Sequence, residues 1–99
     1  MLINTPIRQG DTVTIKFNSG EEVVARLESE TGTDKIQISK PVSLVQSGQG
    51  VGFAPWLFTA EADQGTLSVN MAAVAVLTRT AESAATAYIK QTTGIETSI

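Results

Sequence analysis

The strongest constraint on the fold is a pair of runs within positions 11–29 in which every second residue is apolar. Residues 13–17 place apolar side chains at every second position, and residues 23–27 repeat the pattern. Asn18-Ser19-Gly20 separates the two runs with turn-forming residues. This order predicts a β-hairpin with one buried face. The apolar positions of that face are Val13, Ile15, Phe17, Val23, Ala25 and Leu27.

Three further runs predict three more strands. The third strand starts at Ile36 and meets Pro41, which has no backbone N–H and therefore marks a bulge, a strand end or a sheet edge. A fourth strand is predicted over residues 51–60, broken by Pro55, and a fifth over residues 66–78.

The second half of the fifth predicted strand, Met71 to Leu77, is apolar at every position. A strand with one solvated face would alternate, so this run predicts cover on both faces. In so short a chain, another subunit is one source of that cover.

The period changes near the C-terminus, where residues 80–93 predict an α-helix. Thr80 is the expected N-cap, and Lys90 suits the last turn. The apolar stripe of this helix is Ala81, Ala84, Ala85, Tyr88 and Ile89. Residues 1–9 are expected to form an arm and residues 94–99 a frayed tail. The whole chain, 1–99, is thus predicted to be one mainly β domain, a small five-stranded bent sheet or barrel over residues 10–79 with a short C-terminal helix.

Composition argues against catalysis. The chain has no cysteine and no histidine, which removes thiolate chemistry, zinc–sulfur sites and the usual general base. The carboxylates of residues 21–30 fit a solvated hairpin face better than a paired acid–base or metal site. We therefore expect no enzyme, no catalytic residue, no metal site and no cofactor.

The charge and hydropathy of the chain limit the kinds of partner that it is expected to have. The net charge of −3 argues against a broad electrostatic grip on nucleic acid, although a local site is compatible with it. No signal peptide and no apolar stretch of membrane-spanning length are visible. The expectation is a soluble protein of the cytoplasm without membrane contact.

Residues 10–79 resemble the Sm-like (Hfq-related) family, in particular its small, divergent, phage-associated type. The first half of the motif is matched by the Asn18-Ser19-Gly20 turn, by Ala25 two residues before Leu27, and by a loop in which Glu30 and Asp34 flank three residues. The second half is matched by Val69-Asn70-Met71 followed by apolar residues at 74, 76 and 77. The chain departs from the pattern at three positions: Asp34 replaces asparagine, Asn70 replaces arginine and Met71 replaces glycine. The helix also follows the strands, whereas Sm proteins usually carry it in front.

The resemblance implies a homo-oligomeric ring of five to seven subunits, in which the fourth strand of one subunit pairs with the fifth of the next. The side chains expected at that interface are Phe53, Trp56, Phe58, Val74 and Val76. For the three aromatic residues, packing in the core or at a subunit interface is favoured over a platform for stacking bases.

The resemblance also implies nucleic-acid binding near the central pore. The residues matching that site are Thr31, Gly32, Thr33, Asp34, Lys35, Asn70 and Met71. The loop lacks the family's stacking aromatic residue, and the family's arginine is missing. The first hypothesis is a ring that binds single-stranded RNA or DNA. The alternative is an oligomeric protein-binding scaffold without nucleic-acid binding, for example in phage assembly, which would place it in the host cytoplasm.

Overall fold

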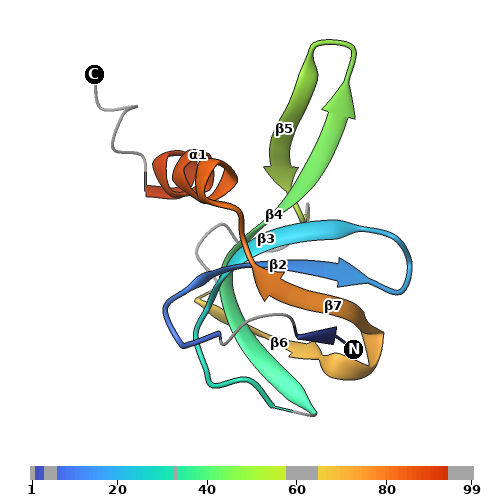
Figure 1. Cartoon of the computed structure of the whole chain (residues 1–99), viewed down its shortest axis with the longest axis vertical. Helices are drawn as coiled ribbons and strands as arrows, with labels where there is room; N and C mark the ends of the chain where they lie inside the picture. The colour runs from blue at the N-terminus through green and yellow to red at the C-terminus, as the bar shows by residue number, and fades with distance from the viewer. Residues whose placement is uncertain (1, 4–6, 33, 58–64, 94–99) are drawn as a thin grey trace.

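The computed structural model describes residues 2–3, 7–32, 34–57 and 65–93, which form a bent β-sheet with one α-helix against its outer face (Figure 1). The elements are β1 (Leu2–Ile3), β2 (Thr12–Phe17), β3 (Glu22–Leu27), β4 (Lys35–Ser47), β5 (Gly50–Pro55), β6 (Thr66–Asn70), the 3₁₀ helix η1 (Met71–Ala73), β7 (Val74–Arg79) and α1 (Glu82–Thr93). The prediction of a mainly β chain with a short C-terminal helix is confirmed.

The sheet order is β1-β7-β2-β3-β4-β5, and β6 also pairs with β4. Both β5 and β6 run antiparallel to β4, β6 along residues 35–39 and β5 along residues 42–47. The ends of both these segments also pair with β3, so β5 and β6 lie along the same edge of β4. They therefore act as one return strand interrupted by residues 56–65. Counted this way, the main sheet has five strands besides β1, but they are not the five predicted, because the predicted strand over residues 66–78 is divided between β6 and β7.

The sheet is bent but does not close into a barrel. Among the described residues, β6 and β7 share no ladder, although η1 joins them directly. Of the two forms expected from the sequence, the bent sheet is therefore the one observed. In the described part of the chain, the sheet therefore ends at β5 and β6 on one side and at β7 with its short partner β1 on the other.

Pro41 lies in a β-bulge, which confirms one of its three predicted roles. Val24 pairs with Val42 and Arg26 with Ser39, so two residues, Lys40 and Pro41, lie opposite Ala25. Lys40 has a φ of 50°, in the left-handed region that non-glycine residues rarely adopt. Beyond the bulge, β4 continues with β5 as a hairpin that projects from the body of the protein (Figure 1).

The prediction of a single fifth strand over residues 66–78 is wrong. Asn70 ends β6, and its side-chain Oδ1 accepts a 2.9 Å hydrogen bond from the backbone N–H of Ala72, which caps η1. The chain turns through η1 before β7 begins. Ala72 and Ala73 are exposed, so the apolar run Met71–Leu77 is not covered on both faces throughout.

The core lies inside the bend of the sheet. Ile15, Leu27, Ile36, Ile38 and Leu77 are fully buried, and burial of each such side chain contributes about 1.5–3 kcal/mol. The alternating apolar positions of the first hairpin all belong to this core, as predicted.

Helix α1 packs outside the bend, where buried Tyr88 joins Val24 and Val42 in a second small cluster. Ala84 and Ala85 are half-buried beside it, while Ala81 and Ile89 are exposed, so only the middle of the predicted stripe is covered. Thr80 does not serve as the predicted N-cap, because its hydroxyl is hydrogen-bonded to that of Thr14 at 2.9 Å and the helix begins at Glu82. Within the described residues, no helix is long and apolar enough to cross a membrane.

Candidate functional site

The two segments expected to form a nucleic-acid site lie side by side. Lys35 at the start of β4 pairs with Asn70 at the end of β6. The backbone N–H of Met71 donates a 2.9 Å hydrogen bond to the carbonyl oxygen of Asp34. The loop before β4 and the corner at η1 therefore form one continuous surface, although 35 positions separate the paired residues in the sequence.

The side chains on this surface offer few groups to a ligand. Met71 is only 4 % exposed and belongs to the core. The Oδ1 atom of Asn70 is used to cap η1, which leaves its amide NH₂ as a donor. Asp34 and Lys35 are exposed, Thr31 and Gly32 are half-buried, and Thr33 lies outside the described residues.

The charge and shape of this surface suit RNA poorly. One cation, Lys35, lies among the carboxylates of Asp34 and the exposed Glu30 of the same loop. Base recognition in single strands relies on aromatic stacking, worth about 1–3 kcal/mol per base, and residues 30–35 contain no aromatic side chain. The surface can donate hydrogen bonds from Lys35 and Asn70, but it lacks a stacking platform.

Two of the predicted interface aromatic residues pack within the chain. The ring of Trp56 stacks on Phe17 with centroids 5.3 Å apart, and its Nε1 donates a 3.2 Å hydrogen bond to Glu21 Oε2. Phe53 meets Tyr88 edge-on at 6.4 Å. Phe58 lies outside the described residues. The interpretation of these aromatic residues as packing groups thus holds for Trp56 and Phe53.

The two predicted interface valines differ in their surroundings. Val74 is 3 % exposed and belongs to the core, so it presents no side chain at the surface. Val76 is half-buried on β7, where its backbone pairs with Leu2 of β1 in a parallel ladder. The chain's own N-terminal strand therefore covers part of the β7 edge.

The open edges of the sheet are the most distinctive feature for assembly. Among the described residues, β6 pairs with β4 on one side and with no strand on the other. At the other end of the sheet, the two residues of β1 are the part of the described chain that covers the outer edge of the six-residue β7. Unpaired edges are templates for strands of another chain, and soluble proteins normally block them.

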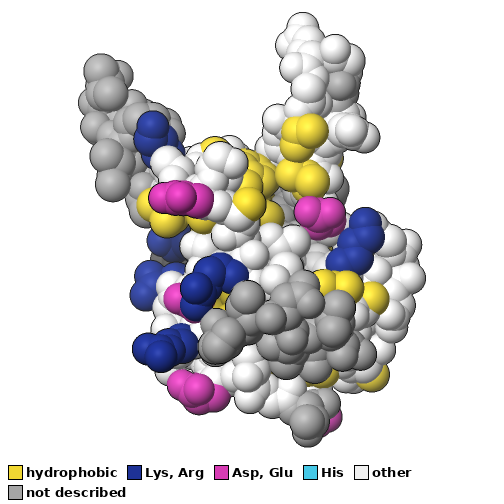
Figure 2. Space-filling view, viewed as in Figure 1, with side chains coloured by type: hydrophobic (Ala, Val, Ile, Leu, Met, Phe, Trp, Pro, Cys, Tyr) yellow, Lys and Arg dark blue, Asp and Glu magenta, His cyan; other side chains and the backbone are white. Residues whose placement is uncertain are grey.

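The projecting hairpin adds exposed apolar surface. Val45 and Val51 are 43 % and 61 % exposed, and both lie beyond the point where β3 supports β4. Figure 2 shows hydrophobic side chains on this hairpin and on α1 below it. A two-stranded hairpin alone is marginally stable in water, so this one is suited to being covered by a partner.

Sequence reasoning missed a groove between α1 and the outer face of the sheet, lined in part by Arg26, Lys40 and Tyr88. Burial raises the pKa of the Tyr88 phenol to about 12. In the sequence, Arg26 lies within the second run of the predicted hairpin, and Lys40 directly precedes Pro41. Only the bulge at Pro41 and the docking of α1 bring them together, so no local sequence signal marks the groove.

Comparisons with known proteins do not assign the chain to a family. No protein-family model matches it, and no curated protein matches it in sequence. Over the part of the chain that the structure describes, no group of three or more acidic, histidine or cysteine residues is arranged to hold a metal ion.

Proposed function

We propose that this protein is a non-catalytic, Sm-like assembly module, whose copies join edge to edge into a ring that serves as a protein-binding scaffold. The observation that carries the proposal is the open sheet, in which, among the described residues, β6 has no strand on its outer edge and β7 has only β1.

Joining two different edges makes a head-to-tail interface, which forms a closed ring when the rotation between subunits is right and a filament when it is not. In the proposed ring, β6 of one copy adds to β7 of the next and displaces β1. Where the structure describes the chain, the displaced ladder has two residue pairs, Leu2 with Val76 and Ile3 with Leu77. A five-residue strand replaces it, so the exchange increases the number of backbone hydrogen bonds.

The surface around Asp34 and Asn70 favours a protein-binding scaffold over a ring that binds nucleic acid. A ring repeats each subunit's charges around its axis. In each subunit this surface carries two carboxylates, Glu30 and Asp34, and one cation, Lys35. The net charge of −3 per chain would be multiplied by the number of subunits. Such a ring repels polyanions, whereas its exposed hairpin valines suit apolar contact with proteins.

Binding of single-stranded RNA or DNA remains the second candidate function. It is favoured by the pairing of Lys35 with Asn70, which places an ammonium group beside a free amide NH₂ on one surface. Fluorescence anisotropy with labelled oligo(U) at low and high salt separates the two functions. A nucleic-acid module binds at low salt and loses affinity steeply as salt rises, whereas the scaffold binds at neither.

The edge-to-edge proposal is tested by placing lysines on the exposed positions of β6. The variant Thr66→Lys/Ser68→Lys puts charges where a joining strand would desolvate them, without touching the core. Sedimentation velocity is expected to report an oligomer for the parent chain and monomers for this variant. The matched control Ser19→Lys, in the exposed β2–β3 turn, retains the oligomer. An oligomer that survives both β6 lysines would exclude this edge as the interface.

A further inference from the structure

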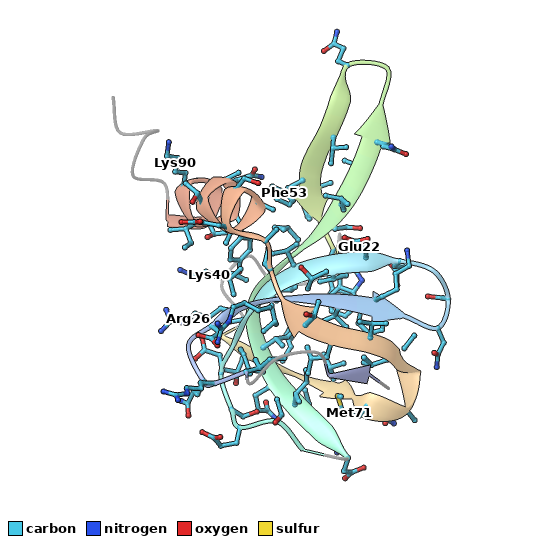
Figure 3. All side chains as sticks on the ribbon, in the orientation of Figure 1. Glu22, Arg26, Lys40, Phe53, Met71 and Lys90 are labelled. Atoms are coloured by element: carbon cyan, nitrogen blue, oxygen red, sulfur yellow. The ribbon has the colours of Figure 1, made fainter. Side chains whose placement is uncertain are left out.

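The groove on the outer face of the sheet has a volume of about 180 Å³. Its lining includes Thr12 of β2, Arg26 of β3, Lys40 at the bulge, and Tyr88 and Thr92 of α1. Arg26, Lys40 and Lys90 lie on the same side of the molecule (Figure 3). Two of the seven lysines and arginines of an acidic chain, Arg26 and Lys40, thus line one groove.

The acids near the groove are already engaged. Glu28 forms an ion pair with the Nε atom of Arg26 at 3.5 Å and accepts a 2.5 Å hydrogen bond from Ser39. Asp11, adjacent to the groove residue Gly10, is paired with Arg79 at 3.2 Å. Within the described part of the chain, the Nη atoms of Arg26 and the Nζ atom of Lys40 make no hydrogen bond. The groove therefore retains positive donors for a ligand.

Lys40 is held in place by its backbone. Its left-handed φ of 50° is maintained by the bulge and by the Tyr88 hydroxyl, which donates a 2.7 Å hydrogen bond to the Lys40 carbonyl oxygen. Strained conformations of this kind persist where the surrounding structure determines them, and they concentrate at functional sites. The bulge directs Lys40 to the groove, whereas a regular strand would keep the simple alternation of sides.

We propose that this groove binds a phosphate group. The guanidinium of Arg26 supplies paired N–H donors with the geometry of phosphate oxygens, and Lys40 supplies a second positive donor. The hydroxyl of Thr12 has no partner among the described residues and can donate a third hydrogen bond. A groove of this size holds a phosphate together with part of the group that carries it. The acidic net charge favours a small phosphorylated molecule as the carrier, and a nucleic-acid backbone is the other outcome of the test below. The site does not depend on the proposed ring.

The alternative to phosphate binding is a purely structural role for Arg26 and Lys40. The groove is lined by Ile89 and Thr92 near the C-terminal end of α1, whose partial negative charge nearby cations offset. On that explanation, loss of the cations lowers the melting temperature, and the parent protein does not bind phosphate. On the phosphate proposal, the parent protein binds, and the variants lose binding while they remain folded.

The test is a titration of the ¹⁵N-labelled protein with inorganic phosphate and, separately, with a short oligo(U), at low salt. Phosphate is expected to shift the amide signals of Gly10, Thr12, Arg26 and Thr92, with affinity in the millimolar range. The variant Arg26→Gln/Lys40→Gln is expected to lose affinity for phosphate by about tenfold or more. Lys40→Gln alone is expected to lose affinity by a smaller factor. Lys40→Gln changes only an exposed side chain, so it keeps the test valid if the double variant unfolds.

The matched control is Lys16→Gln, which removes an exposed cation paired with Glu22 at 3.9 Å and absent from the groove lining. It is expected to leave binding within about twofold. Oligo(U) binding at least about tenfold tighter than free phosphate would identify a nucleic-acid backbone as the ligand. Phosphate binding without this increase in affinity for oligo(U) would identify a small phosphorylated molecule. Absence of groove shifts with both probes, or equal loss in the Lys16→Gln control, would overturn the proposal.

Discussion

The hydroxyl of Tyr88 donates a 2.7 Å hydrogen bond to the backbone carbonyl of Lys40, and so fastens the C-terminal helix to the bulge in β4. Tyr88 is 2 % exposed, and its ring also meets Phe53 at the base of the projecting hairpin. One side chain therefore links three features outside the core: the helix, the bulge and the hairpin.

The first prediction concerns this hydrogen bond. Tyr88→Phe keeps the ring and removes the hydroxyl, which leaves the Lys40 carbonyl without that donor. The free energy of unfolding is expected to fall by about 1–2 kcal/mol. Urea denaturation followed by fluorescence of Trp56, the one tryptophan of the chain, measures it. Unchanged stability would mean that the bond adds nothing beyond the packing of the ring.

The second prediction is a loss of stability at alkaline pH. Burial raises the pKa of Tyr88 to about 12, above the value of about 10 expected in the unfolded chain. Below pH 10 the phenol is protonated in both states. Between pH 10 and 12 the unfolded chain releases the proton and the folded protein retains it, so the free energy of unfolding falls by about 1.4 kcal/mol per pH unit.

The Tyr88→Phe variant is the control for this titration, because it retains every other alkaline group. The difference in stability between parent and variant is expected to shrink as pH rises through this window. Tyr88 is the chain's one tyrosine, so the ultraviolet absorbance of tyrosinate reports its ionisation directly. A midpoint near pH 10 in the folded protein would contradict the buried environment.

The third prediction uses the left-handed backbone at Lys40. At an ordinary strand position, glycine is less stable than alanine by about 0.5–1 kcal/mol. At a φ of 50° the order reverses, because glycine alone avoids the steric cost of about 1–2 kcal/mol. Lys40→Gly is therefore expected to be more stable than Lys40→Ala in thermal denaturation. A more stable alanine variant would show that the bulge does not hold this conformation in solution.

The fourth prediction concerns the corner between β6 and β7. Asn70→Ala removes the side chain that caps η1, which is expected to cost about 0.5–2 kcal/mol. Asn70→Asp retains an acceptor and is expected to recover most of that loss. Urea denaturation of both variants measures the difference, and equal stabilities would exclude the capping role.

The first hairpin was predictable because its signal is local. The face that packs in the core carries an apolar residue at every second position, and the turn residues lie between two such runs. The observed strands, residues 12–17 and 22–27, contain the two predicted runs, 13–17 and 23–27. Pro41 likewise limited the possibilities to a bulge, a strand end or a sheet edge, because a proline inside a paired strand has few permitted positions.

The corner at residues 70–74 was not predicted, because hydrophobicity alone does not separate a buried strand from a short 3₁₀ turn. The available signal was Asn70 directly before Met71, a residue type that caps helices. The two-residue β1 carries too little pattern to be recognised at all. Its pairing depends on an open edge that forms only after folding.

The two candidate surfaces also differ in how far the sequence predicted them. The meeting of Asp34 and Lys35 with Asn70 followed from the family resemblance, whereas the burial of Met71 did not. The groove depends on Arg26 and Lys40, which come together through a register shift and a docked helix. Neither feature is encoded in a local run of residues.

The central claim, assembly through open sheet edges, is tested most directly by the mass of the parent protein in solution. Light scattering coupled to size-exclusion chromatography, over a range of protein concentrations, is the measurement. The account predicts a single species of five to seven copies of the 10.4 kDa chain. A 10.4 kDa monomer at every concentration would contradict it.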